Sequence, residues 1–178
     1  TRLADLGQEQ IDAIVDAVAA AAQAEVEAFA RLAVDETGYG NEADKVKKNR
    51  FAAETIYSFI QPMRTVGVIN RRESDRIIEI AEPFGVVAAI IPSTNPTSTA
   101  IYKILVCLKA RCAVVLSPHP SAARSIIRVA DVLTRAALSA GAPEGAVNCM
   151  TTITQEGTQE LMRSREVALI LATGGLGL

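Results

Sequence analysis

The sequence predicts an α/β fold with a doubly wound parallel sheet, preceded by helices and a β-ribbon. Three apolar runs, "GVVAAII" (85–91), "AVVLS" (113–117) and "VALILA" (167–172), show no polar alternation. Such runs are typical of strands that are buried on both faces of a parallel sheet. Segments with helical periodicity separate these runs, and strands that alternate with helices favour right-handed crossovers.

The elements between these strands follow from apolar spacing and turn residues. A helix is expected from about 97 to 110, where apolar residues recur on one face. A second helix ends at Gly141 and Pro143. A short strand near 146–150 and a helix near 156–163 complete the series. We therefore expect the first half of a Rossmann-like, dinucleotide-binding domain.

The residues before this α/β part have a different character. An alanine-rich stretch from Gln8 to about Val34 predicts one long amphipathic helix, and "DETGYGN" ends it. A weaker helix is expected from about Glu42 to Ile60. The runs "TVGVIN" and "RIIEIAE", joined by "RRESD", predict a two-stranded ribbon. Because an isolated ribbon is only marginally stable, it should lie against something else, such as another subunit.

These features divide the chain into three predicted parts. They are an N-terminal helical segment (1–64), the β-ribbon (65–82) and the partial dinucleotide-binding domain (83–178). A composition shift near Glu82 marks the last boundary.

Composition excludes several classes of function. The formal charge of −2 and the pI near 5.5 leave no electrostatic footprint for nucleic acid. The basic run "KVKKNR" (45–50) is interpreted as a solvated helix face, with contact to an anionic ligand as the alternative. No apolar stretch long enough for a membrane span and no signal-peptide layout are present, so a cytoplasmic protein is expected.

The cysteines do not indicate a metal site. Cys107, Cys112 and Cys149 form no CxxC pair, and the chain has one histidine. We expect reduced, unreactive thiols and no bound metal.

Ligand-binding residues are expected in the loops that follow the strands, because open parallel sheets bind ligands beyond the carboxyl ends of their strands. After the last strand, "TGGLG" permits close approach to a phosphate, although a plain tight turn is the alternative. In "SPHPS", two prolines hold His119 rigidly after a strand, either for ligand contact or for loop packing.

The loop "IPSTNPTST" (91–99) places Asn95 between Pro92 and Pro96 at a helix start. Capping of the helix is one interpretation. The other is that the side-chain amide donates a hydrogen bond to an oxygen that becomes negative during a reaction. The residues alone favour neither.

A longer pattern goes further. The segment "EPFGVVAAIIPSTNPTSTAIYKILVCLKARCAVVLSPHPSA", followed by "AGAPEGAVN" and "LILATGGLG", resembles the aldehyde dehydrogenase superfamily. It is most similar to the coenzyme-A-acylating branch, as is "DETGYGNEADKVKKNRFAAE". This resemblance implies oxidation of an aldehyde to an acyl-CoA through a cysteine thioester, with NAD or NADP as cofactor and coenzyme A as cosubstrate.

The resemblance also implies roles for individual residues. Asn95 matches the asparagine that donates to the thiohemiacetal or thioester oxygen. The ribbon matches a part used in oligomerisation, so a homo-oligomer is expected, with no nucleic acid or membrane partner. The implied cofactor-binding residues are Pro92, Ser93, Thr94, Ser117, His119, Thr173, Gly174 and Gly175.

Two positions depart from the wider superfamily. Ser117 and the following "PHP" replace a lysine that usually contacts the adenosine ribose, a change that the acylating branch shares. The choice between NAD and NADP stays open. The family's nucleophilic cysteine lies well beyond the TGG loop, so these 178 residues are expected to form an N-terminal portion with little turnover of its own.

Two alternatives remain. One is a hydrolytic aldehyde dehydrogenase that releases a free acid, against which the "SPHP" loop argues. The other is a non-catalytic nucleotide-binding or assembly module. The aldehyde itself is not predicted.

Overall fold

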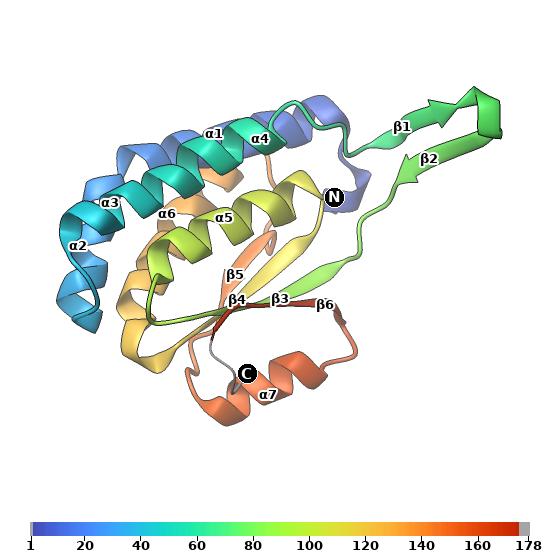
Figure 1. Cartoon of the computed structure of the whole chain (residues 1–178). Helices are drawn as coiled ribbons and strands as arrows, with labels where there is room; N and C mark the ends of the chain where they lie inside the picture. The colour runs from blue at the N-terminus through green and yellow to red at the C-terminus, as the bar shows by residue number, and fades with distance from the viewer. Residues whose placement is uncertain (1, 175–178) are drawn as a thin grey trace.

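The computed structural model describes residues 2–174 and contains a four-stranded parallel sheet (Figure 1). The strand order is β5-β4-β3-β6, and every neighbouring pair is parallel. The strands are β3 (Val86–Ile91), β4 (Ala113–Pro118), β5 (Val147–Cys149) and β6 (Val167–Ala172). The predicted doubly wound α/β fold is therefore confirmed.

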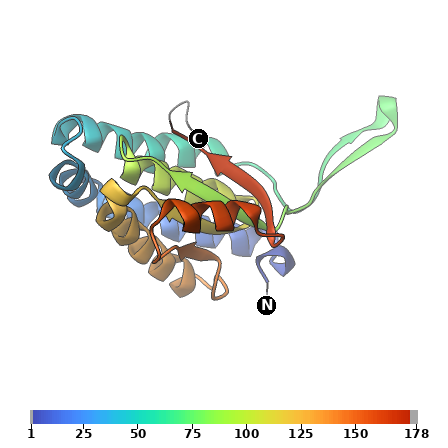
Figure 2. The ribbon, with the colours of Figure 1, turned by 90° about the horizontal axis from the view of Figure 1, so that it is seen from below.

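Helices cover both faces of the sheet. Helices α5 (Pro96–Lys109) and α6 (Ala123–Ser139) lie on one face, and α7 (Gln155–Arg163) lies on the other (Figures 1 and 2). After β5 the chain crosses to the far side of β3, so the strand order reverses beside β3. The carboxyl ends of β3, β4 and β6 consequently meet at a topological switch point, where open α/β sheets bind ligands.

Strand β6 differs from the expectation that it is buried. Within the described residues it pairs with β3 alone, at the edge of the sheet. Leu169 is 39% exposed and Ile170 is 44% exposed. An apolar run cannot reveal its own position in a sheet, because edge and central strands can share one composition.

The predicted long N-terminal helix is two helices, α1 (Gln8–Ala24) and α2 (Val26–Thr37). The break falls at Glu25, whose φ of −111° and ψ of 10° are not helical. No glycine or proline marks this position, so the sequence held no signal for it. Helix α2 ends at Gly38, which adopts the left-handed φ of 67° that favours glycine.

The second predicted helix is observed as one continuous helical stretch of three parts. These are α3 (Glu42–Arg50), the π-helical segment η2 (Phe51–Ile56) and α4 (Tyr57–Ile60). The Asn41 side chain caps α3 by accepting the Asp44 N–H at 2.9 Å. Single-turn segments complete the chain at η1 (Leu3–Asp5), η3 (Glu73–Asp75) and η4 (Pro120–Ala122). Within residues 2–174, no helix has the length and apolar character needed to cross a membrane.

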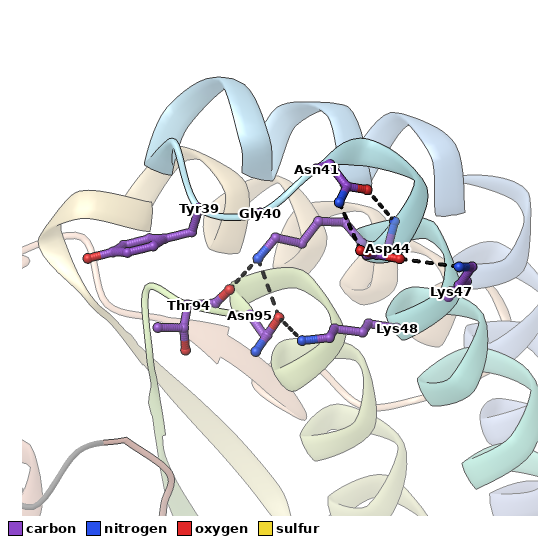
Figure 3. A pocket seen from close by; sticks show the side chains of 9 residues that line it. Tyr39, Gly40, Asn41, Asp44, Lys47, Lys48, Thr94 and Asn95 are labelled. Atoms are coloured by element: carbon purple, nitrogen blue, oxygen red, sulfur yellow. Dashed lines mark hydrogen bonds and ion pairs between the residues drawn. The ribbon is translucent and has the colours of Figure 1, made fainter.

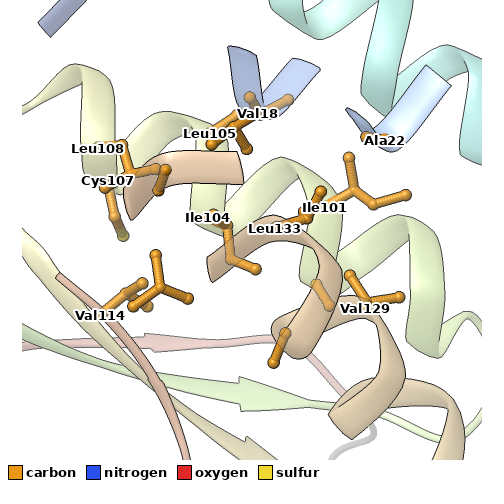
Figure 4. Packing of buried hydrophobic residues seen from close by; sticks show 14 of the residues in the cluster. Val18, Ala22, Ile101, Ile104, Leu105, Cys107, Leu108, Val114, Val129 and Leu133 are labelled. Atoms are coloured by element: carbon orange, nitrogen blue, oxygen red, sulfur yellow. The ribbon is translucent and has the colours of Figure 1, made fainter. Parts of the chain in front are cut away.

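Helices α1, α5 and α6 share one hydrophobic core with the sheet (Figure 4). Val18 of α1, Leu105 of α5 and Leu133 of α6 are fully buried in it, and Val114 joins from β4. The N-terminal helices therefore form a third layer over α5 and α6 (Figure 1). This layer holds α3 against the start of α5, which positions the candidate site.

The predicted ribbon is confirmed as the antiparallel pair β1 (Gly67–Arg72) and β2 (Ile77–Ala81), which projects away from the body (Figure 1). Ile78 and Ile80 are 52% and 59% exposed. Buried Arg111 anchors the base of the ribbon by donating to the backbone oxygen of Ala81 at 2.8 Å.

Candidate functional site

Two surface hollows adjoin the loops that follow the parallel strands. The larger, of about 690 Å³, lies at the carboxyl ends of β3 and β4 beside α7, and we call it the sheet-end hollow. Four of the predicted cofactor-binding residues line it: Pro92, Ser117, His119 and Thr173. The fold thus brings together side chains that are up to 81 positions apart.

Ser117 presents a hydrogen-bond acceptor to the sheet-end hollow. Its Oγ lies 2.8 Å from the Thr158 Oγ1. Thr158 Oγ1 also donates to the Thr154 backbone oxygen at 3.1 Å. Since a hydroxyl has a single proton to donate, Ser117 must be the donor in the first of these bonds. Its remaining lone pairs can accept a hydrogen bond from a ligand hydroxyl. Sequence reasoning missed α7 as a wall of this hollow.

His119 is exposed and has a structural contact. Its Nδ1 accepts the backbone N–H of Ser121 at 3.1 Å, which caps the η4 turn. The proton of the neutral ring is then on Nε2. This contact agrees with the interpretation that His119 packs within its loop. The ring also lines the sheet-end hollow, so contact with a ligand stays a prediction.

Of the other cofactor candidates, Thr94 lines the second hollow, described below, and none besides Pro92 and Thr173 is found in the sheet-end hollow within the described residues. Thr173 Oγ1 donates to the Ile90 backbone oxygen at 3.4 Å, at the switch point. Ser93 lines neither hollow. Gly174 is the last residue that the structure describes, and Gly175 lies outside the described residues. The phosphate role of the glycine loop stays a prediction.

The second hollow, of about 410 Å³, lies between α3 and the start of α5, and we call it the α3–α5 hollow (Figure 3). Asn95 lines it at the N-cap position of α5, but its side chain makes no capping hydrogen bond. Instead its Oδ1 accepts from Lys48 Nζ at 2.9 Å and from Lys45 Nζ at 3.3 Å. The capping interpretation is therefore wrong for the side chain of Asn95.

The basic run in α3 is not simply a solvated face. Lys45 is only 4% exposed, and its Nζ also donates to the Thr94 backbone oxygen. Burial lowers the pKa of Lys45, and the charge of Lys48 lowers it further. Asn49 is fully buried, donates to Val26 O at 3.0 Å and accepts from a threonine hydroxyl of α5 at 2.8 Å. Lys48 and Asn49 follow Lys45 by three and four positions, which places the three side chains on one face of the helix. This spacing was the sequence signal that could have predicted their shared contacts with the start of α5.

Lys103 is a further residue that sequence reasoning missed. Its fully buried Nζ donates to the backbone oxygens of Ile90 at 2.7 Å and Leu171 at 2.6 Å, which joins β3 to β6 at their carboxyl ends. Burial lowers the pKa of Lys103 to about 8. A single lysine inside the apolar segment "AIYKILVC" was the signal.

The cysteines are placed as inert thiols. Burial raises the pKa of Cys107 to about 12 and that of Cys149 to about 11. Cys112 is 2% exposed. Reactive cysteines have a lowered pKa and an accessible sulfur, whereas burial shifts the pKa of Cys107 and Cys149 in the opposite direction. In the part of the chain that the structure covers, no group of three or more His, Cys, Asp or Glu side chains could hold a metal ion.

Residues 2–177 match the aldehyde dehydrogenase family. The chain belongs to this family. The resemblance that the motifs carried is thereby confirmed.

Named relatives of this aldehyde dehydrogenase chain place it near the acylating branch. An acetylating aldehyde dehydrogenase from Geobacillus thermoglucosidasius is 50% identical with a TM-score of 0.96, over 98% of this chain and 39% of that one. The bifunctional aldehyde-alcohol dehydrogenase AdhE of Escherichia coli (strain K12) is 43% identical over 98% of this chain and 20% of its own length. Rhodopseudomonas palustris propionaldehyde dehydrogenase, solved with bound CoA and an acylated cysteine, is 30% identical with a TM-score of 0.84, over 98% of this chain and 40% of that one. The aldehyde dehydrogenase chain therefore spans a fifth to two fifths of the length of these relatives.

Proposed function

We propose that this chain carries the cofactor hollow and the oxyanion donor of an NAD(P)-dependent, coenzyme-A-acylating aldehyde dehydrogenase. The reaction would oxidise an aldehyde to an acyl-CoA through a cysteine thioester. Support comes from relatives whose names describe acetylating or bifunctional aldehyde-alcohol enzymes, and from one with bound CoA and an acylated cysteine. We also propose that the enzyme is located in the cytoplasm.

The orientation of Asn95 is the observation that carries this proposal. Lysine ammonium groups can only donate hydrogen bonds, so the atom facing Lys45 and Lys48 must be the amide oxygen. The amide nitrogen then points away from Lys48 (Figure 3). An N–H held in this way can donate to the aldehyde oxygen, which becomes negative when a thiolate adds to the carbonyl carbon.

The sheet-end hollow fits a dinucleotide. Its volume of about 690 Å³ lies within the usual range of roughly 300–1,000 Å³ for ligand pockets. The prolines and isoleucines that line the hollow offer apolar contact to a flat base of the dinucleotide, and the Ser117 hydroxyl can accept a hydrogen bond from a ribose hydroxyl. The described lining contains no lysine or arginine, which favours NAD over NADP because a 2′-phosphate would lack a cationic partner. The bound cofactor supplies the hydride acceptor.

The nucleophile is proposed to lie outside these 178 residues. Cys107 and Cys149 are protonated at neutral pH, and Cys112 is buried in the core. A thiolate delivered near the Asn95 amide would attack the aldehyde carbon. The resulting thiohemiacetal would lose a hydride, which the bound cofactor would accept. The thioester so formed would pass its acyl group to the thiol of coenzyme A, which regenerates the cysteine.

The ribbon is proposed as the oligomerisation element of a homo-oligomer. It projects from the body, and its exposed isoleucines offer an apolar surface that a second subunit would cover. The division into 1–64, 65–82 and 83–178 is retained as part of the same proposal.

The test is a product assay on the full-length protein that contains this chain. Acetaldehyde and NAD are supplied with and without coenzyme A, and the products are identified by mass spectrometry. We expect acetyl-CoA that depends on coenzyme A, and a loss in kcat of about 100-fold or more in Asn95→Ala. Asn148→Ala, which alters an exposed asparagine that bonds to the Gly145 oxygen, serves as the control.

Two outcomes would contradict the proposal. Acetate formed independently of coenzyme A would indicate a hydrolytic aldehyde dehydrogenase. Binding of NAD without turnover of acetaldehyde, or of longer aldehydes supplied in the same assay, would indicate a nucleotide-binding or assembly module.

A further inference from the structure

Two lysines from one helix converge on a single amide oxygen. Lys45 and Lys48 are three positions apart in α3, so their side chains project from the same face. Asn95 lies 47 positions beyond Lys48. The burial of Lys45 is the less expected feature, because an ammonium group is costly to remove from water unless it is hydrogen-bonded.

The lysine pair acts on the loop as well as on the amide. Lys45 Nζ also donates to the Thr94 backbone oxygen, so it holds both the peptide before Asn95 and the Asn95 side chain. Helix α3 is held in turn by Asn49, which bonds to α2, and by η2, which continues α3 and places Ala52 and Ala53 in the core. Helix α3 thus holds both the backbone beside Asn95 and the side chain of Asn95.

A free asparagine side chain can rotate by 180° and exchange its donor for its acceptor at little cost. In that flipped state an oxygen, rather than an N–H, would face the reacting carbonyl. Two lysine donors make the flipped state unfavourable, because it would place the amide N–H groups against two ammonium groups. The same charges also polarise the amide and strengthen its N–H as a donor.

We propose that Lys45 and Lys48 are positioning residues that hold the Asn95 amide with its N–H group facing the aldehyde oxygen. This inference rests on the proposed function, because it assigns the lysines to the oxyanion donor of that reaction. In this role both lysines act through Asn95, whose amide oxygen they contact.

The experiment is a double-mutant cycle in the full-length protein. Lys48→Met, Asn95→Ala and the double variant are compared by the single-turnover rate of NADH formation from acetaldehyde. Lys48 is exposed, so its replacement should not disturb folding, which thermal melting verifies. Lys45→Met is measured as well. Arg50→Met, which removes a charge from the same helix but pairs with Glu27, is the matched control.

We expect Lys48→Met to slow NADH formation by about 10-fold to 100-fold through misplacement of the donor, with an unchanged KM for NAD. In the Asn95→Ala background the same change should cost less than about 2-fold, since coupled residues are not additive. Lys48→Arg should recover most of the rate, and Arg50→Met should match the parent.

The outcomes separate this inference from the proposal beneath it. A normal rate in both lysine variants, or an equal loss in both backgrounds, overturns the positioning role while Asn95→Ala remains slow. A normal rate in Asn95→Ala overturns the proposed oxyanion donor, and the positioning role with it.

Discussion

Lysines in this chain join elements by burying their ammonium groups against backbone oxygens. Lys103 bridges β3 and β6, while buried Lys109 of α5 donates to the Gln61 oxygen at 2.7 Å and pairs with Asp12 of α1 at 2.6 Å. Lys45 connects α3 to the loop before α5 in the same way. Because a buried charge without a partner is costly, each lysine stabilises one arrangement of its neighbours.

Lys103 should make stability depend on pH. Its pKa is lowered to about 8 from 10.5, because burial disfavours the charged ammonium group. Between these values the unfolded chain binds a proton that the folded chain has released, so the free energy of unfolding rises with pH, by about 3 kcal/mol in total. Urea unfolding from pH 7 to 10 should show this rise relative to Lys103→Met. Parallel pH curves for the two proteins would refute it.

The thiols should resist modification in the folded chain. The raised pKa values of Cys107 and Cys149 leave little thiolate at pH 8, and Cys112 is shielded by the core. We expect slow reaction with Ellman's reagent in buffer and prompt reaction of three thiols in urea. Rapid labelling of any one cysteine before unfolding would show that it is accessible and reactive.

At the scale of elements, α6 is capped by a side chain from another helix. Its N-cap residue, Ala122, has no side chain that could cap. Glu36 at the end of α2 accepts the N–H of Arg124 and the N–H of Ser125, each at 2.7 Å, and the Ser125 hydroxyl at 2.5 Å. This carboxylate also lies at the positive end of the helix dipole.

Loss of that cap should destabilise the fold. We expect Glu36→Ala to lower the free energy of unfolding by about 1–2 kcal/mol, as for other N-caps. Glu27→Ala, which removes an exposed pair with Arg50, should change the free energy of unfolding much less, because solvent screens that pair. Urea titration of both variants measures the free energy of unfolding. Equal losses in the two variants would show that the Glu36 cap stabilises the fold no more than an exposed ion pair does.

At the scale of the whole molecule, the ribbon should control assembly. Ile78 and Ile80 lie on the same face of β2, since side chains alternate along a strand. Replacing both with glutamate should raise the dissociation constant of the oligomer by about 10-fold or more, because a covered carboxylate is costly. Light scattering across a concentration series measures this. Glu79→Gln, on the opposite face, is the control, and an unchanged mass in the isoleucine variant would exclude the ribbon from the interface.

Local sequence patterns were enough to predict the order and type of nearly every element. Continuous apolar runs, helical spacing and turn residues are local properties, so they predicted the parallel sheet, the ribbon and α5 to α7 without knowledge of contacts. Local chemistry also marked Asn95 and His119, which prolines hold at the ends of strands. The family motifs extended this to the acylating branch.

The partners of these residues, by contrast, are known only from the folded structure. The break at Glu25, the exposed edge of β6 and the burial of Lys45 and Lys103 depend on contacts between distant segments, which no local pattern encodes. The orientation of Asn95 is the clearest case. Its two ends are chemically different but similar in shape, and the lysines that distinguish them lie on a helix about 50 positions earlier.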